Sequence, residues 1–362
     1  MEQGTYTIDA SLQRLLGAQD ISMGDVQEIK HLIRGGSVID WRRLYFRSLP
    51  AVNDFLRVAQ YDPDNRAEME RLQTVHRNAV DYLTQALGID IPSVLARPHR
   101  LQNVFLYASN PDGPHQSLAC MILKVMHVIN HLEARQLLYY LPSSERELFS
   151  RVEKRVSKTV MRMIELGFVI EEYVSSEKTK DSLITKILSK RRSTAAQVFD
   201  RIRFRIITSA RKNVIPILYY LNRHLFPFPH VIPGESSNTV APVATLVEEA
   251  FGFRPEDDDE ALSPAFNRFT HREFRVISFV VDVPLRVDDL IDQTAQRQLS
   301  RFGHVVFIPT EFQVFDRASY FLNESGPAAH SHYKERQVQE VIKRLYASEE
   351  TGGGPVQGDD ID

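Results

Sequence analysis

Several features that point to a particular compartment or ligand are scarce in this sequence of 362 residues. Its single cysteine, Cys120, excludes an internal disulfide and a zinc cluster built from cysteines. No run of about 18 apolar residues occurs, and the N-terminal MEQGTYTIDA lacks a basic region followed by an apolar one, which disfavours a membrane span and a secretory signal. The net charge of -3 provides no general attraction for nucleic acid. We therefore expect a cytoplasmic protein that does not enter a membrane.

The sequence has enough apolar residues for a substantial core, since 43% of its residues are hydrophobic. Its length favours two domains. Apolar periodicity and capping signals predict an N-terminal helical domain over residues 1–141, with mostly irregular chain between 88 and 114. The predicted helices cover 22–34, 48–59, 63–87 and 116–141. We expect this domain to regulate, to recognise a partner or to support a homo-oligomer.

From residue 142 onward, strand and helix patterns alternate, which favours an α+β domain with a mixed β-sheet flanked by helices, extending to about residue 347. The predicted strands cover 168–174, 198–208, 274–283 and 304–315. A basic amphipathic helix is predicted from the start signal at Ser144 to about Leu166, before Gly167. Residues 232–270 contain GESSNT and EDDDE without regular periodicity, and we expect them to form a long loop or insertion. A Gly-rich acidic tail over 348–362 is expected to be disordered.

Two of the predicted strands, VFDRIRFRIIT and IPTEFQVFD, carry charged residues on one face. In the first, Arg203 and Arg205 share one side, because side chains alternate along a strand. In the second, Glu311 and Gln313 are likewise two residues apart and share a face. If both strands belong to one sheet, Asp200, Glu311 and the two guanidiniums converge on one surface. That inventory is suited to holding a metal ion and a polyphosphate.

Four short motifs occur in one order along the second half of the chain. They are Lys178-x3-Ser182-x3-Lys186, Asp200-x4-Arg205, Glu311-x-Gln313 and Ala328-Ala329-His330-x2-Tyr333-Lys334. In order, spacing and predicted secondary structure they resemble the motifs of the synthetase domain of the RelA/SpoT family, which makes guanosine tetra- and pentaphosphate. The resemblance covers roughly residues 150 to 346 and leaves the helical part outside.

The sequence also departs from the family pattern. Arg203 stands where the family has a glycine in the aspartate strand. The family's Asn-Gly-Tyr-x-Ser-Leu-His segment has no clean copy, and its best placement puts Phe274 at the tyrosine that stacks on guanine and Ser278 at the histidine. No His-Asp pair occurs, so the helical part does not resemble the hydrolase domain of the long family members.

The resemblance implies transfer of the β,γ-pyrophosphate of ATP to the 3′-hydroxyl of a guanine nucleotide, GDP or GTP, and we extend the acceptors to an RNA end. It implies Asp200, Glu311 and Gln313 as catalytic residues, with Asp200 and Glu311 binding Mg2+. It also implies a set of nucleotide-binding residues: Lys178, Ser182, Lys186, Arg203, Arg205, Phe274, His330 and Lys334. The alternative is a catalytically inactive nucleotide or RNA sensor that keeps the fold.

Each motif also has a purely structural interpretation. Asp200 with Arg203 or Arg205 is consistent with an ion pair at a strand end. His330 is as consistent with capping or packing of the last helix as with a substrate contact. The pair His127-x3-His131 places two imidazoles on one helix face, but the sequence shows no third ligand, so it is only weakly diagnostic of zinc.

Overall fold

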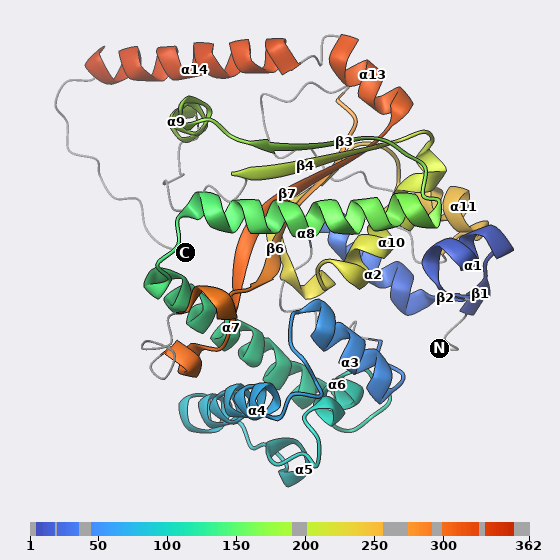
Figure 1. The fold of residues 1–362 in the computed structure, drawn as a ribbon, viewed down its shortest axis with the longest axis vertical. Coiled ribbons are helices and arrows are strands. Elements are labelled where there is room, and N and C mark those ends of the chain that lie inside the picture. The colour runs from blue at the N-terminus through green and yellow to red at the C-terminus, as the bar shows by residue number, and fades with distance from the viewer. Residues whose placement is uncertain are drawn as a thin grey trace.

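A computed structural model gives the fold of the chain and describes residues 5–18, 20–35, 45–189, 201–255, 274–291, 299–325 and 330–350 (Figure 1). At its centre lies a five-stranded sheet with the strand order β3-β4-β7-β6-β5. The strands are β3 (Ile170–Glu177), β4 (Ile202–Thr208), β5 (Val231–Asn238), β6 (Ile277–Arg286) and β7 (Val305–Asp316). The pair β4–β7 is parallel and the other neighbouring pairs are antiparallel. The expected α+β fold with a mixed sheet is therefore confirmed.

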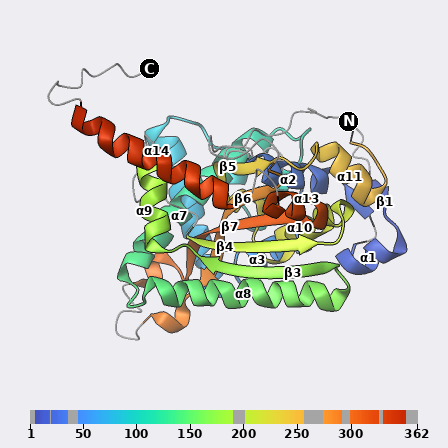
Figure 2. The same ribbon diagram turned by 90° about the horizontal axis from the view of Figure 1, so that it is seen from above.

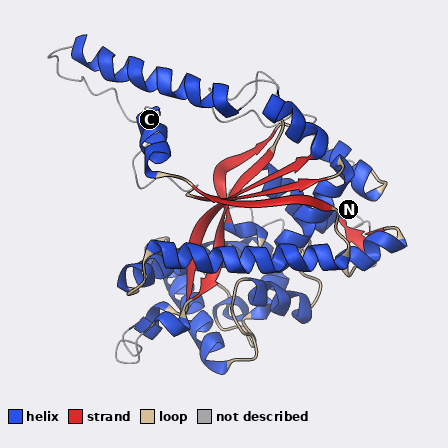
Figure 3. Cartoon of the chain, turned by 45° about the horizontal axis from the view of Figure 1, so that its top comes forward, coloured by secondary structure: helices blue, strands red, loops and turns tan. Residues whose placement is uncertain are grey.

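One face of this sheet is buried against a layer of helices. Ile202, Phe204 and Ile206 are at most 3% exposed, and they point to the same face because they alternate along β4. This face packs against α2 (Met23–Arg34), α8 (Glu145–Leu166) and α10 (Val214–His224), which share one hydrophobic core with the strands (Figure 2). Figure 3 shows the twist of the strands between the helical layers.

The helices of this layer begin and end at the predicted signals. The side chain of Ser144 caps the start of α8 by accepting from the backbone of Glu147, and Gly167, with φ of 99°, ends that helix. Ser22 and Asp25 form a reciprocal capping box at the start of α2. The helices predicted over 22–34 and from 144 to 166 are therefore confirmed in type and position.

The N-terminal residues 5–35 pack with the sheet. Strands β1 (Thr5–Thr7) and β2 (Asp20–Ser22) form a small antiparallel pair on either side of α1 (Ala10–Leu16). Both α1 and α2 contribute to the core beneath the large sheet. Arg223 of α10 donates to Asp25 of α2 and lies 3.5 Å from Glu28. The N-terminal region thus divides into a part that completes the sheet core and a helical group that follows it.

The helical group has a hydrophobic core of its own. It consists of α3 (Leu49–Val58), α4 (Arg66–Asp81) with a π-helical extension (Tyr82–Ala86), α5 (Ser93–Ala96), α6 (Gln102–Ala108) and α7 (Gln116–Tyr140). The short helices α5 and α6 lie within 88–114, and the rest of that stretch is irregular, as expected. Among the helices that the structure describes, none combines the length and apolar character needed to cross a bilayer.

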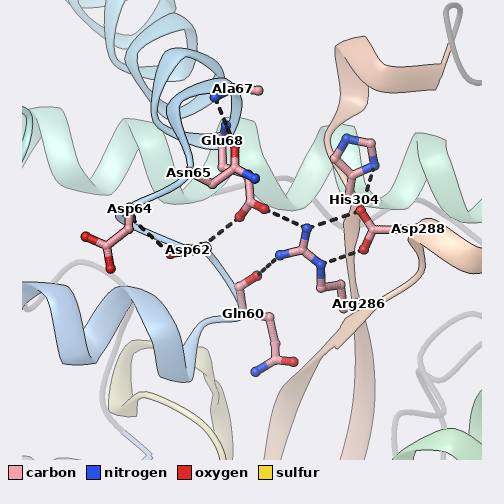
Figure 4. A network of polar contacts seen from close by, with 9 residues as sticks. All are labelled: Gln60, Asp62, Asp64, Asn65, Ala67, Glu68, Arg286, Asp288 and His304. Carbon is pink, nitrogen blue, oxygen red and sulfur yellow. Dashed lines mark hydrogen bonds and ion pairs between the residues drawn. The ribbon is translucent and has the colours of Figure 1, made fainter.

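A polar network joins the helical group to the sheet (Figure 4). Arg286, at the end of β6, donates to Glu68 at 2.6 Å and to Asp288 at 2.5 Å. It also donates to the backbone carbonyl of Gln60 at 3.3 Å, and the other oxygen of Glu68 accepts from the backbone of Asp62 at 2.7 Å. Because Glu68 is buried, this one guanidinium ties the start of α4 to the end of a central strand.

The opposite face of the sheet carries α9 (Lys180–Ser189), α13 (Arg317–Ser325) and α14 (His330–Glu350) (Figures 1 and 2). The stretch expected as a loop over 232–270 contains β5 and then α11 (Val243–Phe251) before residue 256, so that part of the expectation is wrong. Residues 256–270 and the tail from 351 lie outside the described residues. The remaining short helical turns are Arg211–Asn213, Phe228–His230, Asp288–Leu290 and Ser300–Phe302.

Candidate functional site

The register of the parallel pair β4–β7 places the two predicted charged strands side by side. Arg203 lies opposite Glu311, and Arg205 lies opposite Gln313. All four residues are on the sheet face away from the main core, because they alternate with the buried residues Phe204 and Phe312 and their neighbours. The convergence expected from the sequence therefore occurs for every member that the structure describes.

Glu311 is the centre of the site. Its Oε2 accepts from Arg203 Nε at 2.8 Å and lies 3.6 Å from Lys178 Nζ. Its Oε1 accepts from Gln313 Nε2 at 2.7 Å and from Ser278 Oγ at 3.3 Å. Each carboxylate oxygen thus has two donor groups, and the side chain is only 9% exposed.

The charge state of Glu311 follows from these neighbours. Burial alone would raise the pKa of the carboxyl, but the positive charges of Arg203 and Lys178 outweigh it and lower the pKa to about 2. Glu311 is therefore ionised throughout the physiological range. An ionised carboxylate of this kind orients a hydroxyl by accepting its hydrogen bond but is a weak base.

Lys178 follows β3 directly, and its backbone N–H donates to the carbonyl of Arg201 at 2.9 Å, which continues the β3–β4 ladder. Burial lowers the pKa of the Lys178 ammonium to about 7, although Glu311 opposes that shift. Arg203 already neutralises Glu311, and Lys178, with a pKa of about 7, adds only a partial positive charge at neutral pH. Lys186 of α9 adds a further positive charge, which acts on both Lys178 and Glu311.

A second row of polar side chains continues the site along the strands. Arg205 Nε donates to Gln313 Oε1 at 3.1 Å, while the amide nitrogen of Gln313 donates to Glu311. The Gln313 amide thus links the guanidinium of Arg205 to the carboxylate of Glu311 through two hydrogen bonds. Within the described part of the chain, Arg203 and Lys178 contact Glu311, Lys186 acts on it through its charge, and Arg205 reaches it through Gln313.

Among the described side chains, those of Ser182 and Lys334 make no contact with this cluster. Ser182 lies in the first turn of α9, where its backbone donates to Thr179 Oγ1 at 3.3 Å. Lys334 is an exposed residue of α14, and His330 is the first residue of that helix. Asp200 lies outside the described residues. The roles assigned to these residues therefore stay predictions.

Phe274 lies farther along the same face, in a small apolar cluster. Its ring meets that of Phe315 edge-to-face with centroids 6.5 Å apart, and Tyr320 of α13 packs against the same cluster. Its proposed stacking on a base stays a prediction, because here the ring contacts protein. Ser278, which we placed at a histidine position and not among the binding residues, contacts Glu311. The sequence feature that could have identified Ser278 is its alternation with the apolar residues of the predicted strand 274–283.

A separate hollow of about 620 Å³ lies past the carboxyl ends of β4 and β7. Arg211, Lys212, Glu249, Arg275, Asp316 and Ser319 are among its lining residues. Asp316 is five residues beyond Glu311, which corresponds to about 17 Å along the strand. Two of the charged groups are engaged locally, since Glu249 pairs with Arg211 and Asp316 caps α13 through Ser319. The hollow is thus distinct from the Glu311 cluster.

The histidine pair of α7 is joined by His230, with ring centroids 5.7 Å from His127 and 5.5 Å from His131. His131 Nε2 lies 3.4 Å from Asp282. Within the described ranges, however, no group of three or more His, Cys, Asp or Glu residues is arranged to hold a metal ion. The cluster packs between α7 and the sheet, where His131 stacks on Phe307 with centroids 4.0 Å apart.

No protein-family model and no curated protein matches this sequence. Among solved structures, it is similar to small alarmone synthetase 1 of Bacillus subtilis, with 14% identity over 60% of this chain and 90% of the other, at a TM-score of 0.30. Small alarmone synthetase 2 of Bacillus subtilis gives 14% identity over 60% and 94% at 0.31, and a GTP pyrophosphokinase family protein of Streptococcus pneumoniae gives 14% over 56% and 84% at 0.27. These TM-scores are too low to establish a shared fold.

Proposed function

We propose that this protein is a RelA/SpoT-like nucleotide pyrophosphotransferase that moves the β,γ-pyrophosphate of ATP to the 3′-hydroxyl of a guanine nucleotide or an RNA end. The observation that carries the proposal is the meeting of Lys178, Arg203 and Glu311 at one carboxylate oxygen. Lys178 and Glu311 belong to two of the four motifs, and Arg203 is the arginine that departs from the family pattern within a third. Their contact brings the motif residues together, as a common nucleotide site would require.

The basic residues of the cluster are the groups that would bind ATP, the donor of the pyrophosphate. Pyrophosphoryl transfer depends mainly on positioning and on neutralising phosphate charge. Arg203 and Arg205 present planar guanidiniums, which bind phosphate oxygens through paired N–H groups, and Lys178 and Lys186 add point charges. In the proposed reaction the 3′-oxygen of the acceptor forms a bond to the β-phosphorus of ATP. The bond from that phosphorus to the α,β-bridging oxygen breaks, AMP leaves, and the proton of the hydroxyl is released to solvent.

Glu311 is the residue that we assign to the acceptor hydroxyl. Its pKa of about 2 makes it a poor proton acceptor, so its role is to orient the hydroxyl by accepting its hydrogen bond as the oxygen attacks. Gln313 would hold the carboxylate in position through the amide contact at 2.7 Å. Phe274 remains our candidate for contact with the acceptor base, since stacking on a base requires only an aromatic face.

The expected role of Glu311 as a Mg2+ ligand depends on a second carboxylate, that of Asp200. Both carboxylate oxygens of Glu311 are contacted by N–H or O–H donors, and the nearest group at Oε2 is a guanidinium at 2.8 Å. The expectation that Asp200 and Glu311 together bind Mg2+ stays a prediction, because Asp200 lies outside the described residues. The roles assigned above therefore use only the side chains of the chain itself.

The second candidate function is a catalytically inactive nucleotide or RNA sensor. The observation that favours it is the saturation of Glu311, whose two oxygens already have four donor groups. A carboxylate held in this way would serve to keep the cations in place for phosphate binding. Such a protein would bind nucleotide tightly and leave it unchanged.

One assay separates the two. The protein is incubated with radiolabelled ATP and Mg2+ together with GDP, GTP or tRNA, and AMP and the labelled acceptor are followed. The enzyme should release AMP with at least one acceptor, and Glu311→Gln should lower the rate by about 100-fold or more. Glu249→Gln, which removes a carboxylate of the distant Arg211 pair, is the matched control and should retain activity. Nucleotide binding without AMP release would establish the sensor, and absence of both would exclude either function.

A further inference from the structure

We propose that Gln337 of α14 positions Lys186 for the phosphates of the nucleotide, by fixing the last turn of α9 through Ser189. The inference rests on the proposed function in one respect, namely that the cluster around Glu311 binds a nucleotide. It deepens that function because it identifies a positioning residue that lies outside the four sequence motifs.

The helix α9, which carries Lys186, has little packing of its own. Ser189 is the one buried residue among Lys180–Ser189, all of which the structure describes. A helix of 10 residues is at best marginally stable in water by itself. At its start α9 is tied to the sheet, because Lys178, shortly before it, continues the β3–β4 ladder. The position of its last turn must therefore be fixed by another element.

That element is α14, which lies across α9 (Figures 1 and 2). Gln337 Nε2 donates to Ser189 Oγ at 3.1 Å, and Ser189 Oγ donates to the backbone carbonyl of Lys186 at 2.8 Å. Ser189 is 1% exposed and Gln337 is 8% exposed, so water does not readily replace the bond between them. Val341, four residues after Gln337, is also buried, which places both on the packed face of α14. One chain of hydrogen bonds thus runs from α14 to the backbone of Lys186.

The consequence for the site comes from the charge of Lys186. This charge contributes to the lowered pKa of Glu311 and to that of Lys178. Because a charge interaction depends on distance, a shift of the last turn of α9 would move the ammonium relative to Glu311. A ligand binds most tightly to side chains that are already held in place, since ordering them costs free energy. Gln337 therefore acts on the nucleotide through Lys186.

The test measures binding of α,β-methylene ATP, a non-cleavable analogue, by isothermal titration calorimetry in Mg2+. Gln337→Met, which keeps the size of the side chain and removes its donor, should raise the Kd about fivefold. Ser189→Ala breaks the same chain from the other helix and should raise the Kd to a similar extent. The double variant should bind about as well as either single variant, because all three lack the same hydrogen bond. The matched control is Gln339→Met, the same change at an exposed residue of α14, which should leave the Kd unchanged.

Two further measurements separate positioning from a general loss of stability. Hydrogen exchange of the ligand-free protein should be about fivefold faster in α9 for Gln337→Met, with no change in α8. In the AMP-release assay the KM for ATP should rise, while the KM for the acceptor should stay the same. A purely structural role of Gln337 would change neither the exchange of α9 alone nor one KM without the other.

The outcomes are separable. If Gln337→Met binds the analogue as the wild type does, the inference is overturned and the proposed function stands. Unchanged exchange in α9 would also overturn the inference, because other contacts would then fix its last turn. An equal effect of Gln339→Met would overturn it as well, since α14 as a whole would then set the affinity. A wild-type protein that does not bind the analogue would remove the proposed function and the inference together.

Discussion

Arg203 and Glu311 face each other across the parallel ladder of β4 and β7, with Nε 2.8 Å from Oε2. The two partners are not equivalent, because Glu311 is the acidic group of the cluster within the described part of the chain, whereas Arg203 is one of several basic residues. Removing the carboxylate deprives the Nε of Arg203 of its charged acceptor. Removing the arginine leaves Glu311 beside Lys178.

The first prediction follows from this asymmetry. Glu311→Gln should lower the free energy of unfolding by about 3 kcal/mol, since the largely buried Arg203 loses the carboxylate it pairs with. Arg203→Gln should cost only about 1 kcal/mol, because Lys178 and two uncharged donors remain on the carboxylate. Urea unfolding of both single variants and the double variant gives the values and their coupling. A larger loss for Arg203→Gln than for Glu311→Gln would contradict the arrangement.

The buried histidines predict how stability depends on pH. Burial, and then the neighbouring histidines, lower the pKa of His127 and of His230 well below 6.5. As the pH falls below about 6.5, the unfolded chain takes up protons that the folded protein does not, so stability is lost. The loss by pH 5 should reach up to about 2 kcal/mol per histidine. Thermal or urea unfolding at pH 7 and pH 5 should show a smaller difference for His127→Gln and His230→Asn, whereas the exposed His99→Gln should behave as the wild type.

Arg286 predicts how firmly the helical group is attached to the sheet. Arg286→Gln should destabilise the protein by roughly 2 to 3 kcal/mol, because Glu68 is buried and would lose its only guanidinium partner in Figure 4. Hydrogen exchange should report faster opening at the start of α4. The matched control is Arg57→Gln, which removes an exposed arginine that pairs with Asp54 and Asp64 and should have little effect. Equal losses of stability for Arg286→Gln and Arg57→Gln would show that the network does not attach the helical group to the sheet.

Arg155 gives a further prediction about the helix ends. Its guanidinium donates to the carbonyls of Val58 and Leu225, at 3.0 and 2.8 Å, and to that of Pro284. The first two carbonyls lie at the carboxyl ends of α3 and α10. Arg155→Met should therefore cost roughly 3 kcal/mol of unfolding free energy, since buried carbonyls lose their donor. Arg162→Met, on the exposed side of α8, is the control, and calorimetric melting would compare the two.

Local chemistry explains which parts of the fold could be predicted. The helices from 22 to 34 and from 144 to 166 have capping side chains, apolar periodicity and a terminal glycine, so all signals agree. The sequence signals for β5 did not agree, because VIPGESSN contains a proline, a glycine and few apolar residues. Such a sequence is tolerated because β5 lies at the edge of the sheet. α11 begins after Pro242 without a capping side chain, so its start gave no signal.

The site was predictable where its residues lie on strands. Alternation placed Arg203 with Arg205 and Glu311 with Gln313, but it did not specify which residue would face which. That pairing depends on register, which the packing of the whole sheet determines. The contact of Ser278 with Glu311 depends in turn on the antiparallel register of β6 with β7. Contacts of this kind follow from tertiary structure and have no local sequence signal.

The parallel pairing of β4 with β7 has a consequence for how the protein assembles. Arg203 and Glu311 are 108 residues apart in the sequence, and the intervening chain must form β5, α10, α11 and β6. Contacts between such distant residues form late and slow folding, because a long loop must close before they contribute. During synthesis the cationic residues leave the ribosome well before their acidic partner. The Glu311 cluster is thus among the last parts of the chain to become ordered, and a chain truncated before residue 311 would lack the carboxylate that Arg203 contacts.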